Sequence, residues 1–156
     1  MHGPEAEHYI DTMKKEIKQL MKIKNWKAVP KADVPTTSDG KPRTILKGTW
    51  AFKLKRSPDG KALKYKARYC CRGDLQTQGV DFFETFAPVV QWSTIRILLT
   101  LLALANNWKT RQVDYTNAFA QANINEQVYI EPPGGFLSQK CQDSVLHLQR
   151  SLYGEK

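Results

Sequence analysis

Apolar residues near the start of the chain recur at intervals of three and four positions, which is the spacing of one face of an α-helix. We therefore expect a helix over residues 4–24, with an apolar stripe that packs on the protein and a Lys-rich side that faces solvent or touches nucleic acid. The stripe consists of Ala6, Tyr9, Ile10, Met13, Ile17, Leu20 and Met21. Prolines and a glycine then predict an exposed connection over residues 29–43.

Apolar and basic residues alternate over 49–56 and 62–72, on either side of the turn sequence Ser-Pro-Asp-Gly, and this pattern predicts a β-hairpin. Lys53 and Lys55 share one face of the first strand. The basic residues that share one face of the second strand are Lys64, Lys66, Arg68 and Arg72. Both sets lie on the same face of the hairpin only if facing residues have numbers of opposite parity, which requires an even-membered loop. We expect a loop of four residues, 58–61.

The second half of the chain predicts a helix and short strands. Residues 94–106 are apolar nearly all round, which predicts a helix that begins after Ser93 and is buried against a sheet. Further strands are expected near residues 127–131 and 145–149. The fold class is therefore α+β, with an antiparallel sheet, a basic hairpin and packing helices.

A short predicted strand through Gln112 and Val113 ends at Asp114. Open α/β sheets bind ligands at the carboxyl ends of their strands, so this carboxylate is a candidate metal ligand. Small residues follow it, and Phe119 lies five positions further on. An aspartate after a strand also serves as a helix N-cap or a turn residue, and Phe119 also fits plain core packing, so both alternatives stay open.

The charge of the chain is uneven. Its 156 residues include 24 Lys and Arg against 15 Asp and Glu, a net charge of +9. Residues 1–80 carry 18 basic and 8 acidic residues, whereas residues 81–156 carry 6 and 7. Eleven basic residues from Lys41 to Arg72 accompany a single acid, Asp59. Like charges that face each other destabilise a sheet unless a polyanion neutralises them, which favours polyanion binding over a merely solvated face.

The three cysteines, two of them adjacent, fit neither a disulfide framework nor the spacing of a zinc site. They indicate a reducing, intracellular compartment. The sequence shows no signal peptide and no apolar run of membrane-spanning length, so we expect a soluble protein without a membrane partner.

Seven sequence motifs follow one another along nearly the whole chain. They are Trp26-Lys27-Ala28-Val29-Pro30; Trp50-Ala51-Phe52-Lys53-Leu54-Lys55-Arg56 with Pro58-Asp59-Gly60; Tyr65-Lys66-Ala67-Arg68; Glu84-Thr85-Phe86-Ala87-Pro88-Val89-Val90; Val113-Asp114 with Asn117-Ala118-Phe119; Val128-Tyr129-Ile130 with Pro132-Pro133; and Ser151-Leu152-Tyr153-Gly154. In this order they resemble the reverse transcriptase of copia-type long-terminal-repeat retrotransposons. The resemblance implies a right-hand polymerase, with the fingers in about residues 1–90, including the basic hairpin 49–72, and the start of the palm in about residues 91–156.

The resemblance also implies a role for each candidate residue. Asp114 is the catalytic residue and the first metal-binding aspartate, and the backbone carbonyl of Tyr115 adds a second ligand for Mg²⁺, or for Mn²⁺ in its place. The incoming dNTP is contacted by Lys55, Lys66, Arg68 and Phe119. Phe119 selects deoxynucleotides by crowding a 2′-hydroxyl. The nucleic acid is contacted by Lys53, Lys64 and Arg72.

The implied partners are an RNA or DNA primer–template, dNTPs and the remainder of a polyprotein with the rest of the palm, the thumb and RNase H, in a cytoplasmic virus-like particle or in the nucleus. The downstream Tyr-x-Asp-Asp motif of the family is absent from these 156 residues, which contain no Asp-Asp pair. Departures from the family pattern occur at Cys70-Cys71-Arg72, Gly134-Gly135 and Tyr153-Gly154-Glu155-Lys156. The last of these suggests a truncated or disrupted copy.

Two functional hypotheses follow. The first is an RNA-directed DNA polymerase represented by its fingers and early palm, which transfers nucleotides from dNTPs to a primer 3′-hydroxyl with two metal ions. In this hypothesis the C-terminal part of the polymerase domain is absent and the fragment alone is inactive. The alternative is a non-catalytic, nucleic-acid-binding remnant of a degenerate element.

Overall fold

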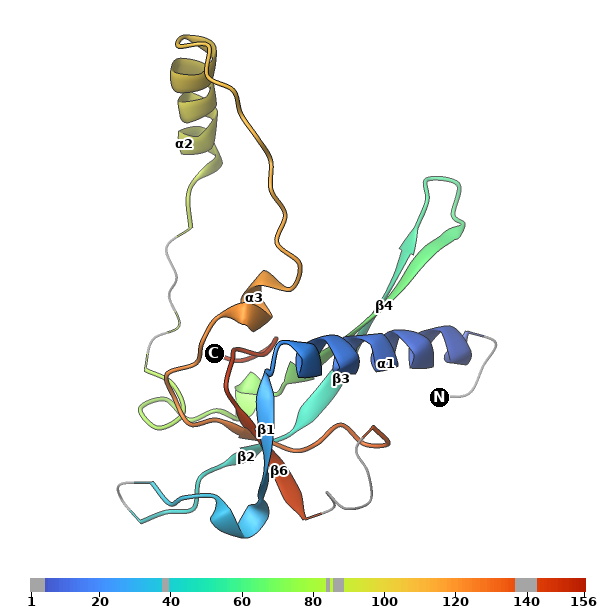
Figure 1. Cartoon of the computed structure of the whole chain (residues 1–156), viewed down its shortest axis with the longest axis vertical. Helices are drawn as coiled ribbons and strands as arrows, with labels where there is room; N and C mark the ends of the chain where they lie inside the picture. The colour runs from blue at the N-terminus through green and yellow to red at the C-terminus, as the bar shows by residue number, and fades with distance from the viewer. Residues whose placement is uncertain (1–4, 38–39, 84, 86–88, 137–142) are drawn as a thin grey trace. The chain divides into compact units, whose positions relative to one another are not determined.

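The structure is a computed structural model, and it describes residues 5–37, 40–83, 85, 89–136 and 143–156. The chain forms two compact units. The larger unit comprises Met1–Phe83 and Asn117–Lys156, and the smaller unit comprises Glu84–Thr116. Figure 1 shows both units and labels several of their helices and strands.

Helix α1 (Ala6–Lys22) lies along strand β4 (Ala62–Cys71) of the hairpin (Figure 1). Part of the predicted apolar stripe supplies its buried side, since Met13, Ile17 and Leu20 are buried. Two other members of the stripe, Ile10 and Met21, are exposed. Tyr9 meets two hairpin rings edge-on, with centroid distances of 5.1 Å to Phe52 and 5.0 Å to Tyr65. The predicted packing helix is therefore confirmed, and its partner is the apolar side of the hairpin.

The end of α1 is fixed by Lys24 and Asn25. Lys24 adopts a φ of 54°, and the backbone amide of Asn25 donates a 3.0 Å hydrogen bond to the carbonyl of Leu20, which closes the last turn. The buried side chain of Asn25 donates from Nδ2 to the carbonyl oxygens of Ala120, at 3.3 Å, and Ser151, at 3.0 Å. One amide group thereby joins the helix end to two segments from the far end of the chain.

A four-stranded sheet forms the centre of the larger unit, with the strand order β1-β6-β5-β2. The strands are β1 (Trp26–Pro30), β2 (Ile45–Leu46), β5 (Tyr129–Ile130) and β6 (Ser144–Leu148). Strand β6 is antiparallel to both β1 and β5, whereas β2 and β5 are parallel. The strands expected near 127–131 and 145–149 are confirmed, and the sheet is mixed rather than wholly antiparallel.

The predicted irregular connection over residues 29–43 is wrong at its start. Val29 and Pro30 belong to β1, where they face Val145 and Ser144, and a short 3₁₀ helix follows at Lys31–Asp33. Pro30 signalled a break because proline cannot donate to a strand ladder. Strand β1 lies at the edge of the sheet and ends at Pro30, so the missing amide is tolerated there.

The core of the larger unit gathers side chains from the sheet, the helix and the C-terminal segment. Those that are at most 1% exposed are Leu20, Leu46, Ala120, Ile130, Leu146, Leu148 and Leu152. Tyr69 of β4 reaches this core, and its hydroxyl donates a 2.7 Å hydrogen bond to the carbonyl of Glu131. The hairpin is thereby anchored to the sheet at its base.

The hairpin pairs β3 (Gly48–Arg56) with β4 in an antiparallel register. The predicted four-residue loop 58–61 is wrong, because the last pair is Arg56 with Ala62 and the loop therefore holds five residues, 57–61. The register shifts by one residue between Lys55 and Arg56, since Lys55 faces Lys64. Because of this shift, Lys55 and the residues before it in β3 still face residues whose numbers have the opposite parity. An odd loop without a shift would have paired residues of equal parity.

The smaller unit contains one continuous helical segment, α2 (Trp92–Ile97) followed by the π-helical η3 (Leu98–Leu104). The predicted helix exists, but it begins after Gln91 rather than Ser93. Its expected burial is wrong within this unit, since Leu101 is 59% and Leu104 is 78% exposed. The apolar pattern indicates a helix that needs a cover on several sides, and the described part of Glu84–Thr116 contains no sheet to provide it.

Candidate nucleotide and nucleic-acid site

Basic side chains gather on one face of the hairpin. Lys53 faces Lys66, Lys55 faces Lys64, and Ala51 faces Arg68 across the two strands. Directly facing residues project from the same side of a sheet, so the one-sided basic face predicted from the sequence is confirmed. A hollow of about 400 Å³ lies on this face, lined by Ala51, Phe52, Lys53, Lys55, Lys66 and Arg68. We call Ala51, Lys53, Lys55, Lys64, Lys66 and Arg68 the basic face, since the Phe52 side chain belongs to the opposite, apolar side of the hairpin.

The cations of the basic face repel one another. The pKa of the Lys66 ammonium is lowered, chiefly by the positive charge of Arg68, then by partial desolvation and by Lys55 and Lys64. An anion placed among these groups would relieve the repulsion and restore the pKa of Lys66. The face therefore has the electrostatic character of an anion site.

Glu16 of α1 is the carboxylate that acts on this cluster. Its side chain is buried, burial raises its pKa, and the charges of Arg68 and Lys66 oppose that rise. Its Oε1 atom has no hydrogen-bond partner in the described residues. One buried acid is too little charge to balance the lysines and the arginine of the basic face, so the excess positive charge remains available to a ligand.

Arg72 stands apart from the basic face. It follows the end of β4 and makes a bidentate pair with Asp74, with Nε at 2.7 Å from Oδ1 and Nη2 at 2.6 Å from Oδ2. Within the described ranges, this is the only ion pair between side chains. The pairing raises the pKa of Arg72 and lowers the pKa of Asp74. Its predicted contact with nucleic acid would have to compete with this carboxylate.

Arg68 and Phe119 meet through a third residue, Tyr153. The guanidinium carbon of Arg68 lies 4.8 Å from the centre of the Tyr153 ring, and the Phe119 ring stacks on the same tyrosine at 5.7 Å. Phe119 belongs to helix α3 (Ala118–Gln121) and is 48% exposed, which argues against its alternative interpretation as a plain core residue. Two candidate dNTP contacts are thus brought together by an aromatic ring.

Sequence reasoning assigned no role to Tyr153, although it lies in the Ser151–Gly154 motif. Its position depends on pairing between remote segments: the amide of Cys71 donates to the carbonyl of Tyr153 at 2.6 Å, and the amide of Gly73 donates to the carbonyl of Gly154 at 3.0 Å. These bonds hold the C-terminal segment against the end of β4. The motif itself was the available signal, because glycine is typical of turns that need a positive φ, and Gly154 adopts one directly after Tyr153.

Asp114 and Tyr115 belong to the smaller unit, whereas the basic face and Phe119 belong to the larger one. The prediction that a strand delivers Asp114 is wrong, since residues 108–115 form neither helix nor strand. Asp114 is exposed and Tyr115 is 72% exposed. A strand needs a partner for its backbone hydrogen-bonding groups. The described residues of Glu84–Thr116 include no strand with which residues 108–115 could pair.

The residues that the structure describes do not build a metal site on their own. Among them, no three His, Cys, Asp or Glu side chains gather closely enough to hold an ion. Asp114 offers one hard carboxylate, which suits Mg²⁺ or Mn²⁺ in kind but not in number, because these ions require several oxygen ligands. Any metal held at Asp114 needs ligands from elsewhere.

The chain belongs to the reverse transcriptase family. Its residues 33–156 match the family described as reverse transcriptase (RNA-dependent DNA polymerase). Part of one family-like motif, residues 84 and 86–88, lies outside the described residues.

Similar proteins come from retrotransposons. The chain is 36% identical over 155 residues to the retrovirus-related Pol polyprotein from transposon TNT 1-94 of Nicotiana tabacum, a match that covers 98% of this chain and 11% of that protein. It is 39% identical over 113 residues to the Pol polyprotein from transposon RE2 of Arabidopsis thaliana, covering 72% of this chain and 8% of that protein. It is 35% identical over 159 residues to the transposon Ty1-ER2 Gag-Pol polyprotein of Saccharomyces cerevisiae, covering 97% of this chain and 8% of that protein.

The chain therefore spans about a tenth of the length of these relatives. No solved structure matches it significantly. None of the helices in the described residues combines the length and the apolar character needed to cross a membrane.

Proposed function

We propose that this chain forms the fingers and early palm of a retrotransposon RNA-directed DNA polymerase, and that its basic face binds the nucleic-acid and nucleotide substrates. The observation that carries the proposal is the hairpin register, which places Lys53, Lys55, Lys64 and Lys66 on one face. Phosphate contacts from such a face position a duplex without reading its sequence. Family membership supports the same substrates.

The dNTP is proposed to lie where the basic face approaches Tyr153. Arg68 suits bidentate contact with a phosphate, whereas Lys66 and Lys55 act as point charges. A bound triphosphate would place negative charge beside Lys66, whose pKa is lowered by the neighbouring cations. Phe119, which is held by stacking on Tyr153, would lie under the sugar and crowd a 2′-hydroxyl. Tyr153 would then orient both contacts without touching the phosphates itself.

Asp114, with the backbone carbonyl of Tyr115, is proposed to contribute to the metal site of the complete enzyme. Mg²⁺, or Mn²⁺ in its place, would assist attack of the primer hydroxyl on the dNTP when bound. The described residues do not supply enough ligands for it, so no catalytic step is assigned to this chain alone. The polymerase would work as part of a Pol polyprotein, in a cytoplasmic particle or in the nucleus.

A second candidate function is a nucleic-acid-binding remnant without catalysis. The observation that favours it is that Asp114 is exposed and that no three possible metal ligands gather among the described residues, because two-metal catalysis needs further carboxylates. Both candidate functions use the basic face to bind nucleic acid. They differ only in whether Asp114 contributes to catalysis.

The test of the basic face is a fluorescence anisotropy titration of a labelled primer–template at several salt concentrations. Changing Lys53, Lys55, Lys64 and Lys66 together to Gln should weaken binding and lower the steepness of the salt dependence, by about 0.9 for each phosphate that is no longer neutralised. The matched control changes four lysines of α1 to Gln, namely Lys14, Lys15, Lys18 and Lys22. Binding that survives the hairpin changes, or falls equally with the helix changes, would refute the assignment.

A further inference from the structure

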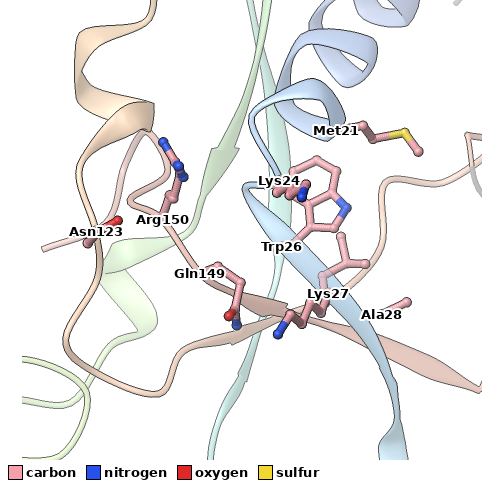
Figure 2. Close-up of a pocket in the computed structure, with 9 residues that line it drawn as sticks. Met21, Lys24, Trp26, Lys27, Ala28, Asn123, Gln149 and Arg150 are labelled. Atoms are coloured by element: carbon pink, nitrogen blue, oxygen red, sulfur yellow. The ribbon is translucent and has the colours of Figure 1, made fainter.

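Asn25 is a polar side chain that the larger unit encloses completely. Its exposed fraction is 0%, and among the largest fully buried side chains of the described residues it is the only polar one. Its chain neighbours Lys24 and Trp26 line a hollow of about 590 Å³ together with Gln149 and Arg150 (Figure 2). Because side chains leave this space open, the segments around it depend partly on hydrogen bonds for their placement.

The backbone and the side chain of Asn25 both bind segments from the second half of the chain. The carbonyl oxygen of Asn25 accepts hydrogen bonds from the backbone amides of Gln149, at 2.7 Å, and Arg150, at 3.1 Å. The Nδ2 atom donates to the carbonyl oxygens of Ala120 and Ser151. Only a group that carries two hydrogens can donate to two carbonyls at once, which a hydroxyl or a carboxylate cannot do.

The amide of Asn25 also carries a cost. Its Oδ1 atom is buried and has no hydrogen-bond partner among the described residues. A buried acceptor without a partner lowers stability. A side chain that only filled space would not need this oxygen, so the amide serves through its two donors.

The two carbonyls that accept from Asn25 lie beside the aromatic pair of the candidate site. Ala120 directly follows Phe119, and Ser151 precedes Tyr153 by two residues. The rings of Phe119 and Tyr153 stack at a centroid distance of 5.7 Å, with 20° between their planes. The side-chain hydrogen bonds of Asn25 therefore reach the backbone next to each ring.

Helix α3, which carries Phe119, needs this support. It has four residues, and helices this short are not stable by themselves. Phe119 is 48% exposed, so the packing of its own ring does not fix the helix. The hydrogen bond from Asn25 holds buried Ala120 from inside the protein. At the surface, the side chain of Asn117 donates to Gln19 of α1 at 3.3 Å.

We propose that Asn25 is a positioning residue for sugar selection, because its amide holds the backbone next to Phe119 and the backbone next to Tyr153 at once. The inference rests on the proposed function in one respect, namely that Phe119 crowds the 2′-hydroxyl of the nucleotide. A ring excludes a hydroxyl only if it cannot retreat, so its support has to be rigid. Without the two hydrogen bonds the ring pair loosens, and a ribonucleotide enters more readily.

The experiment is a competition titration with the full chain. Fluorescence anisotropy follows dATP labelled on its terminal phosphate, and unlabelled dATP and ATP displace it, which gives the ratio of their dissociation constants. Asn25→Leu keeps the branched shape but removes both donors. It should lower the preference for dATP about fivefold, which is within the range of couplings inside one hydrogen-bond network. Phe119→Ala is the reference, since it removes the crowding ring.

Two further variants separate positioning from a general loss of stability. If Asn25 acts through Phe119, Asn25→Leu should change the preference no further in the Phe119→Ala background. Val145→Ala is the matched control, because it removes buried volume from β6 and should lower the unfolding temperature without changing the preference for dATP. Where Asn25→Leu does not unfold cooperatively on heating, Asn25→Ser decides, with an intermediate preference expected because it retains a single donor.

The outcomes distinguish this inference from the proposed function. If Phe119→Ala lowers the preference for dATP but the Asn25 variants leave it unchanged, the inference is overturned and the proposed function stands. Equal losses of dATP and ATP binding in the Asn25 variants would likewise overturn it, because they would show that Asn25 serves stability alone. An unchanged preference in Phe119→Ala would refute the role proposed for Phe119, and the inference with it.

Discussion

At the scale of single residues, Gly154 determines where the aromatic part of the candidate site lies. Its φ of +83° is disfavoured for a side-chain-bearing residue, and a Cβ atom added there would overlap the carbonyl oxygen of Cys71. The close approach lets the C-terminal segment bond to the end of β4, which in turn sets Tyr153 beside Arg68.

Gly154→Ala should therefore destabilise the larger unit by about 3 kcal/mol, combining left-handed backbone strain with overpacking against Cys71. Gly60→Ala is the matched control, because Gly60 has a similar φ of +79° but open space around its Cβ position. Its cost should be about 1 kcal/mol, from backbone strain alone. Urea unfolding of both variants measures the difference, and equal losses of stability would show that the approach to Cys71 is unimportant.

The family resemblance was enough to identify Arg68 and Phe119 as candidates, because the motifs around them are specific. It could not show that both meet Tyr153, because that arrangement requires hydrogen bonds between residues far apart in sequence. For Asp114 the sequence indicates the chemistry of a metal ligand, but the predicted strand that would deliver it is absent from the described segment.

At the scale of elements, alternation in the sequence was enough to predict the hairpin and its one-sided basic face. The loop length was predicted wrongly because two arrangements bring both sets of basic residues to one face. One is an even loop, and the other is an odd loop with a register shift of one residue. Here the shift lies between Lys55 and Arg56. Strand β2 was missed because its two residues are too few to show a period.

The helical segment Trp92–Leu104 carries the other element-scale prediction. Contiguous exposed leucines form an apolar surface that a soluble domain normally covers. Leu101→Gln with Leu104→Gln should lower the fluorescence of a hydrophobic dye bound to the chain severalfold. Leu63→Gln is the control, because Leu63 is 67% exposed but lies on the hairpin, away from this helix in sequence. Equal dye binding by the double variant and the unaltered chain would show that the leucines are covered in solution.

At the scale of the whole molecule, the chain spans about a tenth of the length of its relatives. The isolated 156 residues should not extend a primer, because the sequence contains no Asp-Asp pair. In a longer polypeptide that completes the reverse transcriptase, Asp114→Asn should reduce nucleotide incorporation to background while primer–template binding stays within about twofold, because the basic face supplies the phosphate contacts.

Incorporation of labelled dNTP into a primer measures this prediction, with Asp33→Asn, at another exposed carboxylate, as the control. Synthesis by the isolated chain, or normal turnover by the Asp114→Asn enzyme, would remove Asp114 from the catalytic role and leave the binding role of the basic face intact.

The pairing of β1 with β6 has a consequence for how the protein is made. Trp26 lies near the beginning of the chain, and its partner Leu148 lies near the end. A ribosome releases β1 long before the strand that completes it, since synthesis proceeds from the N-terminus at about 5–20 residues per second. During that interval α1 and the hairpin can associate through nearby sequence, but the central sheet cannot close. The nascent chain therefore presents an unpaired strand edge for several seconds, and holding that edge apart from other chains becomes a task for the cell's chaperones.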